Sequence, residues 1–262
     1  WRLFSDPSSK LGGVAAVLLQ ALNPYMMWLF DSASYHAADP QKRAERTARY
    51  VDTTVFGDKA HADAAAESVR RIHSNIAWTE PMSGIEYPAD KQEWLIWTHN
   101  TIVFGVGRAA QLFGPDVTPD DLDRLVREQH IAARLAGIDV EGQGLAASWD
   151  DLVAYIDSQK GWMALSIPAA EVSRMFRAPK VWGGNPIKLW VAVVIQDGIL
   201  AMLPDWAQLL YGIEGRPMNL EKAAKSTRKM MERARNKTSY EQMITEFTTK
   251  VDTHPYRKVR AR

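Results

Sequence analysis

The chain has 262 residues, of which 46% are hydrophobic and 24% are charged, a balance typical of a globular protein with one large core. It contains no cysteine, which excludes disulfides, iron–sulfur clusters, thiolate-ligated haem and cysteine zinc sites. The formal net charge is +1, but residues 214–262 hold 13 basic against 6 acidic residues. We expect one domain over residues 1–262, whose basic C-terminal helices pack on an acidic body or touch an anionic membrane surface.

Helical periodicity and helix-capping signals recur along the whole chain. Thr118-Pro119-Asp120-Asp121 combines an N-cap, a proline in the first turn and two acidic residues, and Ser148-Trp149-Asp150-Asp151 repeats this pattern. Strand alternation is not evident, so the sequence predicts an all-α fold of about ten helices. These helices are Ser9–Phe30, Pro40–Phe56, Ala60–Ala77, Asp90–Phe113, Pro119–Gly137, Ser148–Gln159, Ala169–Arg177, Pro186–Leu203, Leu220–Arg235 and Ser239–Lys250.

Several functional classes lack support in the sequence. The stretch Gly105-Val-Gly107-Arg-Ala-Ala110 superficially matches a dinucleotide-binding fingerprint, but it lies inside a predicted helix with no strand before it. There is no HExxH or Glu-x-x-His motif, and the basic excess is confined to the C-terminal end, which argues against nucleic-acid binding. No apolar run reaches the ~20 residues that span a bilayer. Together with the missing cysteines, this leads us to expect a cytoplasmic protein.

Two of the six histidines fall on apolar helical stripes. His73 belongs to the stripe Val69-Ile72-His73-Ile76, and His99 to the stripe Leu95-His99-Ile102-Val103-Val106. A buried imidazole needs a partner, which can be a backbone carbonyl, a tyrosine hydroxyl or a metal ion. The stripes alone leave these alternatives open.

Arg43, Arg46, Thr47 and Tyr50 share one side of a predicted helix, because they are spaced by three, four and seven residues. Two guanidinium groups beside two hydroxyls can bind carboxylates or polarise bound oxygen. The alternative is a solvent-exposed polar face.

These residues belong to an ordered set of short motifs over roughly residues 2–212. The set includes Asp39-Pro40 with Arg43-x-x-Arg46-Thr47-x-x-Tyr50, Val69-Arg70-x-x-His73, Tyr87-x-Ala89-Asp90, Trp97-x-His99 and Leu203-Pro204 with Tyr211-Gly212. In this order and spacing the chain resembles the family that contains latex-clearing protein, the rubber oxygenase, and the MpaB-type oxygenases.

The resemblance implies a globin-like helical core around one non-covalent haem b, with His73 as its axial ligand and His99 as the alternative. Arg43 and Thr47 would lie beside the haem, where they stabilise charge on bound oxygen or hold a propionate, and Tyr50 would be a further cofactor contact. The implied activity is that of an oxygenase that uses dioxygen on a hydrophobic, isoprenoid- or lipid-like small molecule. A non-catalytic haem- or hydrophobe-binding protein and a haem-free helical interaction protein are the alternatives.

Two positions depart from the family pattern. Where latex-clearing protein has a lysine able to reach iron, this chain has Arg46, whose guanidinium has no available lone pair. We therefore predict an open distal position. The catalytic glutamate of the preceding helix has no clear counterpart, and Asp31 is the nearest carboxylate.

Overall fold

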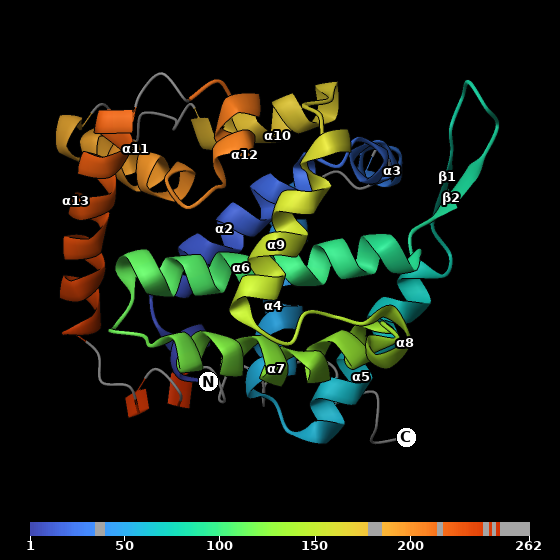
Figure 1. Cartoon of the computed structure of the whole chain (residues 1–262), viewed down its shortest axis with the longest axis horizontal. Helices are drawn as coiled ribbons and strands as arrows, with labels where there is room; N and C mark the ends of the chain where they lie inside the picture. The colour runs from blue at the N-terminus through green and yellow to red at the C-terminus, as the bar shows by residue number, and fades with distance from the viewer. Residues whose placement is uncertain (35–39, 178–184, 214–216, 238–240, 243–244, 247–262) are drawn as a thin grey trace.

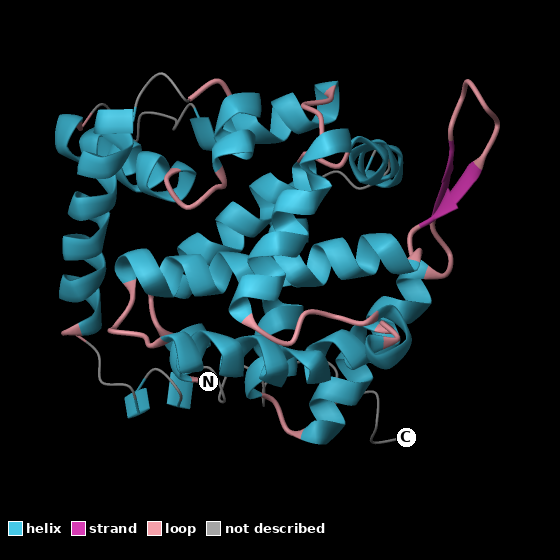
Figure 2. Ribbon diagram, in the orientation of Figure 1, coloured by secondary structure: helices cyan, strands magenta, loops and turns pink. Residues whose placement is uncertain are grey.

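The computed structural model describes residues 1–34, 40–177, 185–213, 217–237, 241–242 and 245–246 (Figure 1). Helices dominate this part of the chain, as the sequence predicts (Figure 2). The α-helices are α1 (Arg2–Ser5), α2 (Ser8–Ala21), α3 (Pro24–Ser34), α4 (Pro40–Phe56), α5 (Lys59–His73), α6 (Gln92–Phe113), α7 (Pro119–Ala136), α8 (Val140–Gln143), α9 (Trp149–Ser158), α10 (Ile167–Arg177), α11 (Pro186–Leu200), α12 (Asp205–Leu210) and α13 (Pro217–Arg235). A short 3-10 helix, η1 (Gln159–Trp162), follows α9.

Helix boundaries follow the capping signals in the sequence. At the start of α7 the Thr118 hydroxyl accepts a hydrogen bond from the Asp121 N–H, while the Asp121 carboxylate accepts one from the Thr118 N–H. The helix ends before Gly137, which adopts a left-handed conformation with φ of 91°. Ser148 caps α9 in the same way by accepting from the Asp151 N–H. The two helices predicted from these signals and the all-α class are confirmed.

The predicted helix Ser9–Phe30 is wrong as a single element, because the chain turns at Pro24. α2 and α3 meet at 101°. Proline has no N–H and restricts the residue before it, and the Asn23 side chain caps the new helix by accepting from the Met26 N–H at 3.1 Å. In the described part of the chain no single helix is long and apolar enough to cross a membrane. The bent pair of α2 and α3, taken together, meets the criteria of length and composition for a membrane span, and only these criteria.

The structure also contains a small antiparallel hairpin that the sequence did not predict. β1 (Ala77–Thr79) pairs with β2 (Glu86–Pro88) and projects from the helical body (Figures 1 and 2). Each strand has only three residues, too few for an alternating pattern to stand out. The predicted helix Ala60–Ala77 therefore ends at His73 instead. The last predicted helix, Ser239–Lys250, lies outside the described residues except at 241–242 and 245–246.

The crossing of α2 and α6 is the largest helix–helix interface of the described residues. Gly12 faces Gly105 at this crossing, and a Cβ atom added to Gly12 would lie 2.5 Å from the Gly105 carbonyl oxygen. The second glycine of the apparent dinucleotide motif, Gly107, faces the ring of Trp149, which stacks on Phe104 with centroids 5.7 Å apart. The glycines of α6 therefore serve close packing, which agrees with the exclusion of a dinucleotide-binding loop.

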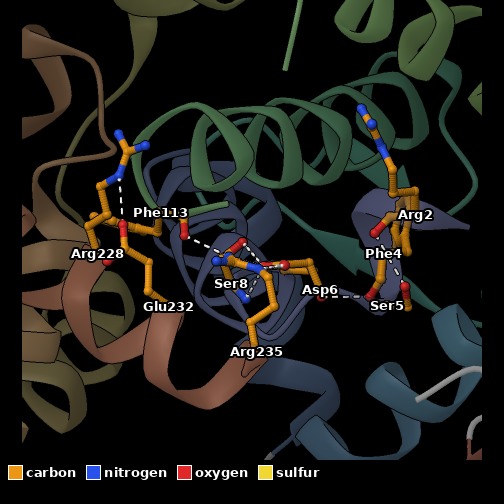
Figure 3. Close-up of polar contacts among 10 residues, drawn as sticks. Arg2, Phe4, Ser5, Asp6, Ser8, Phe113, Arg228, Glu232 and Arg235 are labelled. Carbon is orange, nitrogen blue, oxygen red and sulfur yellow. Dashed lines mark hydrogen bonds and ion pairs between the residues drawn. The ribbon is translucent and has the colours of Figure 1, made fainter. Parts of the chain in front are cut away.

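A buried ion pair joins the two ends of the described chain. The Asp6 carboxylate, in a residue only 5% exposed, receives hydrogen bonds from Arg235 Nε at 2.5 Å and Arg235 Nη2 at 3.1 Å (Figure 3). The same carboxylate accepts from the N–H and hydroxyl of Ser8 at the start of α2. Arg235 Nη2 also donates to the carbonyl oxygen of Phe113 at 2.9 Å. The pair of Asp6 and Arg235, with its further hydrogen bonds, thus connects the end of α13 to the start of α2 and to the end of α6.

We predict that Gly12→Ala lowers the free energy of unfolding by about 2 kcal/mol or more, since the added methyl group meets backbone atoms that cannot move aside. Gly13→Ala is the matched control, because a Cβ atom there meets nothing within 4 Å. Alanine has the higher helix propensity, so this control should gain about 0.5–1 kcal/mol. Urea unfolding followed by circular dichroism measures both, and equal stabilities for the two variants would contradict the close crossing.

We predict that Arg235→Met destabilises the protein by about 3 kcal/mol, because it leaves the Asp6 carboxylate buried without its counter-charge. Arg228→Ala is the control on the same helix. Arg228 pairs with Glu232 at the surface (Figure 3), and such exposed pairs contribute less than about 0.5 kcal/mol. Thermal or urea unfolding compares the two variants. If their losses were similar, the buried pair would not anchor α13.

Candidate functional site

α4 and α5 form an antiparallel helical hairpin. Gly57 and Asp58 connect them, and the Asp58 side chain caps α5 by accepting from the His61 N–H at 2.8 Å. The two helices contact each other. α4, which carries Arg43 and Thr47, therefore directly precedes α5, which ends at His73, and packs against it.

His73 lines a pocket of about 380 Å³ at the end of α5, which we call the His73 pocket. Its other walls come from α5 itself, the segment leading into α6, the start of α6 and the end of α7. They are Glu67, Arg70, Arg71, Ser74, Asp90, Gln92, Leu95, Ala136 and Gly137. Charged and polar side chains outnumber apolar ones in this set.

Two hydrogen-bonding side chains hold the walls of the His73 pocket together. Arg70 Nη1 donates to the carbonyl oxygen of Leu135 at 2.5 Å and so joins α5 to α7. The Gln92 amide donates to the Gly137 carbonyl oxygen at 2.9 Å and accepts from the Asp139 N–H at 3.2 Å. The start of α6 and the end of α7 are therefore fixed relative to each other.

The apolar stripe predicted around His73 is wrong. Ile72 is 53% exposed, His73 itself is half-buried, and Ile76 lies beyond the end of the helix. α5 instead buries its small residues, among them Ala62 and Ala66, against its neighbours. The small alanines form the buried face of α5, and Ile72 at its end lies at the surface.

The stripe around His99 is closer to the prediction. Leu95, Val103 and Val106 are buried, while His99 and Ile102 are partly buried. Burial, and to a smaller extent the charge of nearby His130, lowers the pKa of His99 to about 4. His99 is therefore a neutral imidazole near neutral pH. Leu95, one turn before it on α6, lines the His73 pocket.

The polar residues predicted on α4 lie near the surface. Arg46 and Thr47 are exposed, and Tyr50 is half-buried. Arg43 belongs to α4, but its side chain lies outside the described residues. The structure thus places Arg46 and Thr47 on a helix that contacts α5.

Asp31, the only acidic residue predicted for the site, is exposed on α3. The main contacts of α3 are with α2, α10 and β1 rather than with the α4–α5 hairpin. In the described residues there is no group of three or more His, Asp or Glu side chains that could hold a metal ion.

His61 is a buried histidine that the sequence analysis missed. Its Nδ1 lies 2.9 Å from the Asp58 carboxylate, and its Nε2 is buried with no hydrogen-bond partner among the described residues. Hydrogen bonds from the backbone and side chain of His61 lower the pKa of the Asp58 carboxyl. The only sequence signal was its position three residues after an N-capping aspartate.

Comparison with known families decides the relationship of the chain. Residues 1–236 match the family described as ER-bound oxygenase mpaB/B'/rubber oxygenase, catalytic domain. The chain belongs to this family. No curated protein and no solved structure matched it. Membership in this oxygenase family confirms the resemblance predicted from the ordered motifs, and it makes the chain an oxygenase-type catalytic domain.

We predict that the oxygenase domain loses stability in mild acid through His99. The pKa of His99 is about 4 in the folded state and 6.5 in a model peptide. Between these two pH values the unfolded chain takes up this proton and the folded chain does not. Lowering the pH from about 7 to about 5 should therefore cost about 2 kcal/mol of unfolding free energy. In His99→Leu, which cannot be protonated, this part of the slope should vanish. Urea unfolding at both pH values tests it, and an unchanged slope in the variant would refute the assignment.

Proposed function

We propose that this domain is a haem b-dependent oxygenase of hydrophobic small molecules, with His73 as the axial ligand. The observation that carries the proposal is the position of His73 at the wall of a pocket at the end of α5, the helix that directly follows the Arg-x-x-Arg-Thr helix α4. The family match supports oxygenase chemistry in general.

The residues around His73 suit a porphyrin in kind. A neutral imidazole has a lone pair for iron, and the half-buried His73 lines the pocket. Arg70 and Arg71 supply two guanidinium groups for propionate carboxylates, and Leu95 and Ala136 supply apolar wall. Bound haem would supply the iron that activates dioxygen.

The side chains of α4 would act on the oxygen side of the pocket. The Arg43 guanidinium and the Thr47 hydroxyl are hydrogen-bond donors that can stabilise negative charge as it develops. Tyr50, one turn further along α4, can orient them or the cofactor edge. The Arg46 guanidinium offers no available lone pair and would not replace a ligating lysine.

One observation favours a non-catalytic haem- or hydrophobe-binding protein as the second candidate. Asp31, the nearest candidate for the family's acid, is exposed on α3, whose main contacts lie elsewhere. Without a carboxylate from α3 at the pocket, proton transfer during substrate oxidation would depend on water or on Glu67 and Asp90, which line the pocket. Oxygen uptake by the haem-loaded protein with squalene as a test alkene separates the two candidates, because only an oxygenase consumes oxygen in proportion to the alkene.

We predict that the purified protein binds haemin in equimolar amount and shows a Soret band that shifts on reduction with dithionite. His73→Ala should lose the band, because the remaining residues offer no second imidazole at that wall. Absorption spectroscopy with haemin titration measures both.

Two further variants assign the ligand. His99→Ala tests the alternative ligand on α6, and His130→Gln is the control, since its Nε2 already donates to the Ala146 carbonyl oxygen at 2.8 Å. Loss of haem binding in His99→Ala but not in His73→Ala would overturn the ligand assignment. No Soret band in the parent protein would overturn the haem proposal itself.

A further inference from the structure

A second pocket, of about 580 Å³, lies on the other side of the first turns of α6. Neighbouring residues at the start of α6 line different pockets, which shows that the two pockets are separate. Gln92 and Leu95 line the His73 pocket, whereas Lys91, Glu93 and Trp94 line the second one. Its remaining walls come from α3, β2, α9, η1 and the segment after α8. We call it the aromatic pocket.

Five aromatic side chains line this pocket. They are Tyr25, Tyr87, Trp94, Tyr155 and Trp162. Three of the rings form a continuous series: Tyr25 and Tyr87 have centroids 5.1 Å apart, and Tyr87 stacks on Trp94 at 5.8 Å. This series connects three elements, so the wall is held rigid by ring contacts. Flat aromatic walls favour a ligand with a flat ring.

The pocket also contains neutral hydrogen-bonding groups. Asn100 is only 4% exposed and lines the pocket, where its amide is paired with the Tyr155 hydroxyl. Burial raises the pKa of Tyr155 to about 12, so this hydroxyl remains protonated. Gln143 and Gln159 add two more amides. These groups can donate to and accept from hydroxyl or carbonyl oxygens on a ligand.

The two charges at the pocket cancel each other. Lys91 Nζ lies 2.5 Å from the Glu93 carboxylate, and the same ammonium lies 5.6 Å from the centre of the Tyr87 ring. Neither charge is left over to attract an ion. A charged ligand would compete with one member of this solvent-exposed pair, whereas a neutral ligand would leave the pair in place.

We propose that the aromatic pocket binds a neutral, flat ring compound that carries hydroxyl or carbonyl groups, of the phenol or quinone class. The site is separate from the His73 pocket and its occupancy does not require haem. The volume lies within the range of small-molecule sites, and the combination of aromatic walls with a few convergent polar groups is typical of them.

The test uses 2-naphthol, a neutral two-ring phenol, titrated into the full chain by calorimetry. Trp162→Ala removes an exposed wall, and Tyr155→Phe removes only the hydroxyl, so both variants should fold. Each should weaken binding by about fivefold or more, the size expected for one lost ring or hydrogen bond. Trp190→Ala is the matched control, an exposed tryptophan on α11, and should change the affinity less than about twofold.

Two further ligands test selectivity. 2-Naphthoate has the same rings but a negative charge, and we expect it to bind at least about tenfold more weakly. Cellobiose, which also stacks on aromatic rings, should not compete with 2-naphthol. The proposal is overturned if 2-naphthol fails to bind, if cellobiose or naphthoate binds more tightly, or if the affinity falls in Trp190→Ala or His73→Ala but not in the pocket variants. Loss of haem binding alone would leave these outcomes unchanged, so the two proposals fail separately.

Discussion

The backbone contact between Gly12 and Gly105 determines where α6 lies in the molecule. With no side chains between them, α2 and α6 approach more closely than any other residue pair would allow. This contact fixes the long helix α6 at its middle, and both of its ends make further contacts. Its first turns separate the His73 pocket from the aromatic pocket, and its last carbonyl groups receive Arg235.

The pair of Asp6 and Arg235 stabilises the same arrangement, because it connects α13 to α2 and α6. Two charges taken out of water are costly, and here the cost is offset by a two-point hydrogen-bonded contact and by the Ser8 and Phe113 groups that complete it. The family match ends at residue 236, directly after Arg235. The matched region therefore coincides with the part of the chain whose first and last segments this ion pair joins.

The candidate sites differ in the electrostatics of their walls. The His73 pocket is lined by several charged side chains, which suits a ligand with carboxylates at its edge. The aromatic pocket has one ion pair that neutralises itself and rings elsewhere, which suits a neutral ligand. Both pockets use the segment between β2 and the start of α6, and the short hairpin before it lines the aromatic pocket through Tyr87 although it contributes little to the core.

The sequence by itself determined the helical class, most helix boundaries and the family, because capping residues and apolar periodicity are local signals. It also placed Arg43, Thr47 and His73 on consecutive helices, and the short Gly57-Asp58 connection made those helices neighbours. Only the tertiary structure decided that Ile72 is exposed, that His61 is buried and that five aromatic residues from distant segments share one pocket. Burial depends on which face of a helix meets another element, and that choice is made by long-range packing, which no local pattern records.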